Sequence, residues 1–204
     1  MKFCGRELRI ETSDARAKAA DLRERGRAGR FIRLDEILPV LCDPVTKESL
    51  RMEGGQLLAG SRAYPVVGDS PQLFPCDVRR VSQLLESGDV LARFPSLSPM
   101  EQYCAFGLLK SSGGANLNHE DPWYERHLWR ACRMLEDVRG AFLDIGCDDA
   151  FLSRGMLSED VQYLGLDPSG SSASTRVGGL GEFLPFRDAS FDAAGFQTSL
   201  DHVF

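Results

Sequence analysis

The residues with the clearest potential for chemistry lie at the ends of apolar segments in the last third of the chain. Asp144 and Gly146 follow an apolar run in "GAFLDIGC", and Asp167 ends the run "VQYLGLD". In parallel sheets, ligands bind at the carboxyl ends of the strands, and a carboxylate there can accept hydrogen bonds from both hydroxyls of a ribose. Gly146 and Asp167 are 21 residues apart, close to the ~20 expected of a nucleotide site. This spacing fits NAD(P) or S-adenosylmethionine.

The pattern of elements from residue 139 onward predicts an α/β fold with a doubly wound parallel sheet. Two apolar strands, at 140–147 and 161–167, are separated by the helical pattern "AFLSRGML", and a third strand is expected at 191–197. We expect the glycine- and serine-rich segment 168–181 to form an irregular crossover.

Four short stretches in this region are more specific than a glycine and an acid alone. In order, "LDIGC…FLS", "YLGLDPS", "EFLPFRDASFDAA" and "LDHV" resemble the class I S-adenosylmethionine-dependent methyltransferases. The resemblance covers residues 139–204 and implies part of a Rossmann-like parallel sheet, S-adenosylmethionine as cofactor and methyl transfer as the reaction. It implies these cofactor-binding residues: Asp144, Gly146, Cys147 and Asp148 in the first loop, Asp167 and Pro168 at the ribose, Glu182, Phe183 and Leu184 near the adenine, and Gln197 below the site. No catalytic base is assigned, because methyl transfer from a sulfonium depends mainly on in-line placement of the nucleophile.

Two positions depart from the family pattern. Asp148 stands where the family usually has glycine, and the carboxylate of the cofactor would lie near this loop. Like charges at about 4 Å repel by about 1–4 kcal/mol. Leu180 replaces an acid that often contacts the adenine. The alternative is therefore a non-catalytic, methyltransferase-derived scaffold or accessory subunit that binds a protein partner.

The resemblance also ends early. The family's sheet has seven strands, and the sequence after residue 140 leaves no room for the last three. We therefore expect a fragment, a truncated chain or a subunit completed by another copy or a partner. The 191–197 strand would then form an exposed edge, and an apolar edge strand favours pairing with another chain. We expect a homo-oligomer or a partner subunit at this edge.

A small α+β module is predicted at residues 34–77, with short strands around Leu50, at 56–59 and at 64–67. It resembles the small zinc-ribbon-derived domain that activates tRNA and protein methyltransferases. Eleven residues match that pattern: Leu41, Cys42, Pro44, Lys47, Leu50, Tyr64, Pro65, Val66, Asp69, Pro71 and Leu73. Val45 occupies the position of the family's second cysteine. Because zinc needs about four N or S ligands, we expect no zinc and a buried, apolar role for Cys42.

The remaining segments are predicted to be mainly helical. Residues 78–138 form a helical lead-in, in which the spacing of Val78, Val81, Leu84 and Leu85 gives one apolar face. Residues 1–33 carry ten Lys and Arg against five Asp and Glu, although the 204-residue chain has a net charge of −6. We expect this basic arm to pack against the acidic remainder or to expose a solvated helix face; RNA binding is the alternative.

The composition points to the cytoplasm. The six cysteines include no CxxC pair, which is typical of free thiols in a reducing compartment. No apolar stretch is long enough for a membrane span, and the N-terminus has no apolar signal core.

Overall fold

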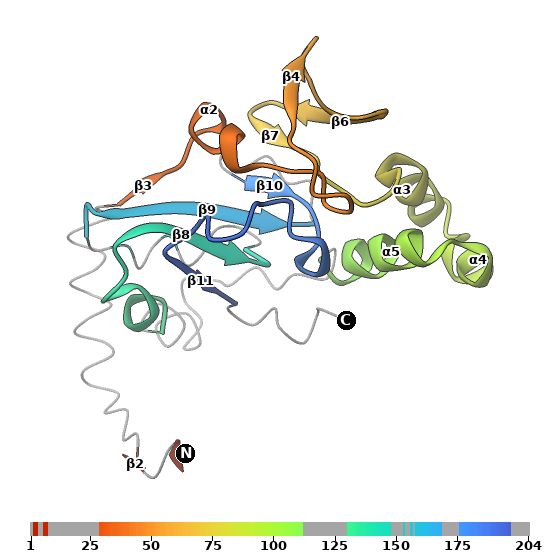
Figure 1. Cartoon of the computed structure of the whole chain (residues 1–204). Helices are drawn as coiled ribbons and strands as arrows, with labels where there is room; N and C mark the ends of the chain where they lie inside the picture. The colour runs from red at the N-terminus through yellow and green to blue at the C-terminus, as the bar shows by residue number, and fades with distance from the viewer. Residues whose placement is uncertain are drawn as a thin grey trace.

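The computed structural model is that of an α/β protein, and it describes residues 2–3, 6–7, 29–111, 130–147, 153, 156, 158–168 and 176–196 (Figure 1). The strands are β1 (Lys2–Phe3), β2 (Arg6–Glu7), β3 (Arg30–Phe31), β4 (Arg51–Glu53), β5 (Gln56–Ala59), β6 (Arg62–Val67), β7 (Ser70–Pro71), β8 (Gly140–Ile145), β9 (Val161–Asp167), β10 (Arg176–Gly178) and β11 (Ala193–Gly195). The helices are α2 (Leu34–Ile37), α3 (Val78–Glu86), α4 (Val90–Arg93), α5 (Pro99–Ser111) and the 3₁₀ helices η1 (Leu38–Val40), η2 (Phe94–Ser96) and η4 (Gly181–Phe183). Residues 130–135 are also helical.

The centre of the molecule is a parallel sheet with the strand order β10-β9-β8-β11, and β3 pairs with the first part of β9. Strand β8 pairs over its whole length with residues 161–166 of β9, with Asp144 opposite Gly165. Both are almost entirely buried, as expected for strands covered on both faces. The predicted parallel sheet is confirmed. Within the described part of the chain, β11 lies at one edge of this sheet, and Phe196 directly after it is exposed.

One prediction about this sheet is wrong. Segment 168–181 was expected to be an irregular crossover, but residues 176–178 within it form β10, parallel to β9. The glycines there lie against residues 72 and 73. A Cβ atom on Gly178 would clash with the end of the Gln72 side chain, and one on Gly179 would lie 3.1 Å from the Leu73 carbonyl oxygen. The Leu73 amide donates to the Gly178 carbonyl at 2.7 Å. Glycine inside a strand often marks a place where another backbone approaches closely, and it gives this segment the composition of a loop.

The two faces of the sheet are covered by different parts of the chain (Figure 1). Because side chains alternate along a strand, Phe142 and Tyr163 point to one face, where they pack on residues 131–135 of the helix. Leu143 and Leu164 point to the other face.

The second face carries α2, η1 and the strands of the small module. The strands β4, β5, β6 and β7 form an antiparallel sheet, which confirms the predicted short strands at 56–59 and 64–67. Its buried residues Leu41, Leu57 and Leu73 share one core with Leu164 and Leu166 of β9. The backbone joins the two sheets as well, because Leu41 bridges to Phe186 and Gln72 bridges to Gly178. The module and the parallel sheet are therefore built around a common core.

A third cluster holds α3 and α5 against the carboxyl edge of the parallel sheet. Val81 is fully buried, and Val78, Leu84 and Leu85 pack beside it, which confirms the predicted apolar face of α3. The start of α5 is fixed by a capping box, in which the Ser98 amide donates to Glu101 Oε2 at 2.9 Å and the Glu101 amide donates to Ser98 Oγ.

Candidate functional site

The candidate site lies at the carboxyl ends of β8 and β9, which point toward α5 (Figure 1). Asp144 occupies the next-to-last position of β8, and its side chain is almost completely buried. The Tyr163 hydroxyl of β9 donates a hydrogen bond to Asp144 Oδ2. Tyr163, to which the sequence pattern assigns no role, holds this carboxylate on the face that the 130–135 helix covers.

Gly146, Cys147 and Asp167 come together beside Asp144. The amides of Gly146 and Cys147 both donate to the Leu166 carbonyl, at 2.8 and 3.3 Å, so the loop after β8 folds against the end of β9. Gly146 has a φ of 75°, a left-handed conformation that glycine adopts without strain. Asp167 ends β9, is 4% exposed, and accepts the Gly179 amide with its backbone carbonyl at 3.1 Å. Four of the predicted residues are thus neighbours across two strands.

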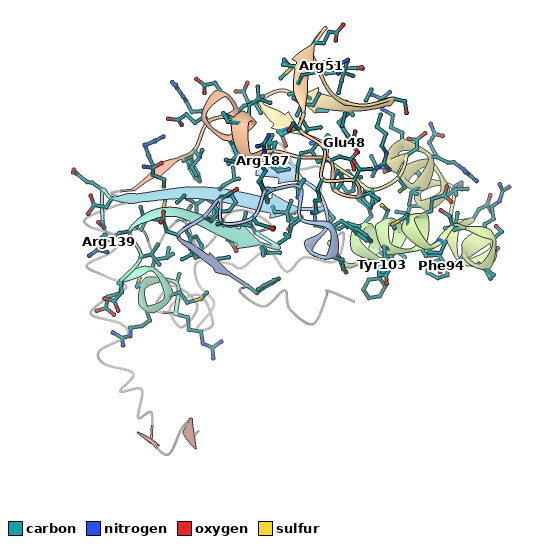
Figure 2. All side chains as sticks on the ribbon, viewed as in Figure 1. Glu48, Arg51, Phe94, Tyr103, Arg139 and Arg187 are labelled. Carbon is teal, nitrogen blue, oxygen red and sulfur yellow. The ribbon has the colours of Figure 1, made fainter. Side chains whose placement is uncertain are left out.

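Helix α5 covers the neighbouring part of this edge. A Cβ atom on Gly107 would lie 2.6 Å from Leu180 Cδ2 and 3.6 Å from Pro168 Cβ, so any larger residue here would displace the Leu180 side chain. The Tyr103 ring meets Phe183 edge-on, with the ring centroids 5.4 Å apart. Figure 2 places Tyr103 on α5 and Arg139 at the far, amino end of β8. The packing of α5 on this edge was not predicted from the sequence, although an isolated glycine inside a helix is a signal for close packing.

The other predicted residues lie further along the chain. Glu182 and Phe183 belong to η4, and the Leu184 carbonyl accepts a hydrogen bond from Lys47 Nζ at 2.5 Å. Phe183 packs in the α3–α5 cluster together with Leu180. Asp148 and Gln197 lie outside the described residues.

A groove of about 500 Å³ lies on the module side of the sheet. It runs between α2 and β7. Most of the residues that line it are apolar and include Ile32, Pro71 and Val177, and the charged residues in its lining include Asp35 and Asp69. Its sheet residues, Leu164 and Val177, face away from Asp144 and Asp167. This groove is therefore separate from the candidate site.

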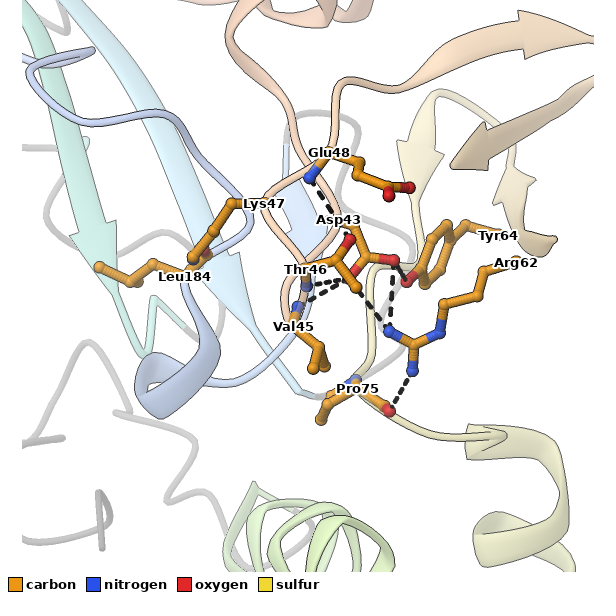
Figure 3. A network of polar contacts seen from close by, with 9 residues as sticks. All are labelled: Asp43, Val45, Thr46, Lys47, Glu48, Arg62, Tyr64, Pro75 and Leu184. Atoms are coloured by element: carbon orange, nitrogen blue, oxygen red, sulfur yellow. Dashed lines mark hydrogen bonds and ion pairs between the residues drawn. The ribbon is translucent and has the colours of Figure 1, made fainter. Parts of the chain in front are cut away.

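A buried polar network stands at the turn where the resemblance aligns Cys42 and Val45 with a pair of zinc ligands (Figure 3). Its centre is Asp43, which is fully buried. Asp43 Oδ1 accepts the amides of Val45 and Thr46 at 2.7 and 2.8 Å, and Oδ2 accepts the Tyr64 hydroxyl at 2.6 Å. Cys42 beside it is also fully buried, as predicted.

Arg62 completes this network. Its Nη1 donates to both oxygens of Asp43, at 3.0 and 3.2 Å, and its Nη2 donates to the Pro75 carbonyl at 2.6 Å. One carboxylate thereby connects the 43–46 turn, β6 and the segment that leads into α3. Among the described residues, no three His, Cys, Asp or Glu side chains gather in a way that could hold a metal ion.

Acid should weaken the folded state through Asp43. Burial raises the pKa of Asp43, but the hydrogen bonds from Tyr64, Thr46 and Val45 and the charge of Arg62 outweigh it, so the pKa lies below the ordinary 3.8. A lowered carboxyl pKa contributes stability above the unfolded pKa, and this contribution is lost as pH falls through the folded pKa. Urea midpoints between pH 6 and pH 2 should therefore fall most steeply below about pH 4. The Asp43→Asn variant should show a shallower fall; the same acid slope in both proteins would contradict this origin.

The fold and the site define an α/β protein whose parallel sheet carries buried carboxylates at the carboxyl ends of neighbouring strands. No protein-family model matches the chain. No similar sequence is found among curated proteins. In the part of the chain that the structure describes, every helix is too short or too polar to cross a membrane.

Proposed function

We propose that the chain is a class I methyltransferase-like protein whose candidate site binds S-adenosylmethionine. The observation that carries this proposal is that Asp144 and Asp167, both buried, lie at the carboxyl ends of the two central, paired strands β8 and β9. The strand order supports it. Counted along the chain, β8, β9, β10 and β11 are the first to fourth parallel strands of this region, and their spatial order is 3-2-1-4. This is the first part of the doubly wound order 3-2-1-4-5-6, in which nucleotides bind at the carboxyl edge.

The residues at this edge suit the ligand chemically. Asp167 offers two acceptor oxygens for the ribose hydroxyls. Gly146, with its positive φ, lets the loop backbone approach the ligand closely. Asp144 lies two residues before Gly146, at the point where β8 leads into the loop. The hydrogen bond from the Tyr163 hydroxyl fixes its side chain. When bound, the cofactor would supply a methyl group activated by its sulfonium.

A second candidate function is a scaffold that binds a protein partner without binding the cofactor. It is favoured by the packing of the segment that the resemblance assigns to the adenine. Phe183 contacts Tyr103, and Leu180 contacts Gly107, so these side chains are already engaged with α5. The carboxylate of Asp148 also favours the scaffold, because it would repel the carboxylate of the cofactor.

Calorimetric titration with S-adenosylmethionine and S-adenosylhomocysteine distinguishes the two functions. We expect the wild-type chain to bind both ligands with at most millimolar dissociation constants. Asp167→Ala should weaken binding about 10- to 100-fold, since a hydrogen bond to a charged group contributes about 1.5–3 kcal/mol. Glu159→Ala, an exposed acid before the amino end of β9, is the matched control and should bind like the wild type.

Asp148→Gly should bind about tenfold or more tightly than the wild type, because it removes a like charge near the ligand carboxylate. Absence of heat with the wild type and with Asp148→Gly at millimolar ligand would reject cofactor binding and favour the scaffold. Equal weakening by Asp167→Ala and Glu159→Ala would place the ligand elsewhere.

A further inference from the structure

Two cysteines that are 28 residues apart in sequence meet between the small module and α5. Cys76 lies in the segment that joins β7 to α3 and is half-buried, and Cys104 lies inside α5 and is fully buried. Their Sγ atoms are 2.8 Å apart. A disulfide bond has a length of about 2.05 Å, so a shift of less than about 1 Å would join them.

The surroundings make the two thiols unequal. A hydrogen bond with the Cys104 thiol lowers the pKa of Cys76 against the opposing effects of burial and of the Glu101 and Asp77 carboxylates. The Arg62 guanidinium, bound to the Pro75 carbonyl next door, contributes positive charge. The same contact and burial raise the pKa of Cys104. Cys76 therefore carries the thiolate character, and it is also the more exposed of the two residues.

We propose that Cys76 and Cys104 form an oxidation site, at which a peroxide converts the two thiols into an intramolecular disulfide. An accessible thiol of lowered pKa beside a second cysteine is the arrangement that reacts in this way. The Cys76 thiolate attacks one peroxide oxygen, the O–O bond breaks, and a sulfenic acid forms while the departing oxygen leaves as water after taking up a proton. The Cys104 sulfur then attacks the Cys76 sulfur, the S–O bond breaks, and the hydroxyl leaves with the Cys104 proton as a second water. In sum, two thiols lose two electrons and two protons, and hydrogen peroxide is reduced to two waters.

The disulfide would fix α5 to the segment that joins β7 to α3. One turn along α5 from Cys104 is Gly107, whose packing against Pro168 and Leu180 positions the helix over the carboxyl edge of the parallel sheet. Tyr103, next to Cys104, holds Phe183. Oxidation would therefore restrict movement of the helix that covers this edge, whichever ligand or partner the edge binds.

The test treats the folded full-length chain with hydrogen peroxide and maps its tryptic peptides by mass spectrometry. Cleavage after Arg62, Arg79, Arg93 and Lys110 puts Cys76 in peptide 63–79 and Cys104 in peptide 94–110. We expect these two peptides to appear linked, two hydrogens lighter than their sum, and to separate on treatment with dithiothreitol. Because the disulfide closes the chain segment between Cys76 and Cys104, it should raise the melting temperature by roughly 5–10 °C, and dithiothreitol should reverse this rise.

The controls separate this pair from the other thiols. Cys132→Ala removes a buried cysteine that packs with Phe142 and Tyr163, on the other face of the parallel sheet from the small module. It should leave the linked peptides and the rise in melting temperature intact. Cys76→Ser, at the half-buried position, should abolish both. The proposal is overturned if peroxide leaves Cys76 and Cys104 open to alkylation in the folded wild type. It is equally overturned if Cys76 proceeds to sulfinic acid without a link, or if the link joins different chains.

Discussion

Replacing Asp43 by alanine should lower the free energy of unfolding by about 3–5 kcal/mol, because it leaves buried hydrogen-bond donors without an acceptor and removes the partner of a half-buried arginine. The donors are the amides of Val45 and Thr46 and the Tyr64 hydroxyl, all aimed at one carboxylate. Chemical denaturation followed by circular dichroism at pH 7 measures the effect.

Graded variants identify the origin of this loss. Asp43→Asn keeps an acceptor for the two amides but not the charge, so it should cost about half as much as the alanine variant. Tyr64→Phe removes one hydroxyl and should cost about 1–2 kcal/mol. A loss below about 1 kcal/mol for Asp43→Ala would mean that the network contributes little and that the turn is held by packing alone.

Leu41→Ala should be similarly damaging, with a loss of about 2–5 kcal/mol for a fully buried leucine. Leu41 is 0% exposed and belongs to the core that the small module shares with β8 and β9. Because this core is common to both sheets, we expect urea to unfold them together, in one transition that moves to lower urea in the variant.

Val67→Ala is the matched control for this experiment. Val67 lies in the same module but is 64% exposed, so the change should alter stability by less than about 0.5 kcal/mol. Two separated transitions in the wild type, with only one of them shifted by Leu41→Ala, would contradict the shared core.

Elements with a clear hydrophobic pattern could be predicted from the sequence. The runs that form β8 and β9 are apolar along their length and end in an acid or a glycine, and α3 has apolar residues at helical spacing. In such segments the spacing of the apolar residues shows which side chains must be buried, and this spacing differs between a helix and a strand. Since parallel strands share a carboxyl edge, the proximity of Asp144, Gly146 and Asp167 also followed from the sequence.

Strand β10 could not be predicted because its composition reflects a neighbour that is remote in sequence. Gly178 and Gly179 are glycines because Gln72 and Leu73 pass against them. The same applies to Gly107, whose missing side chain makes room for Leu180. In both places the glycine indicates that another segment packs closely there, but the sequence does not show which segment it is.

The sequence by itself was sufficient to predict the order of the elements in the parallel sheet and the acidic residues at the ends of β8 and β9. Only the tertiary structure revealed that Asp43, Arg62 and Tyr64 connect the 43–46 turn to β6 and Pro75, and that Cys76 meets Cys104. The physical reason is the range of the interactions. Periodicity and turn chemistry act between residues close in sequence, whereas a buried carboxylate or a pair of thiols gains its partners only when distant segments pack together.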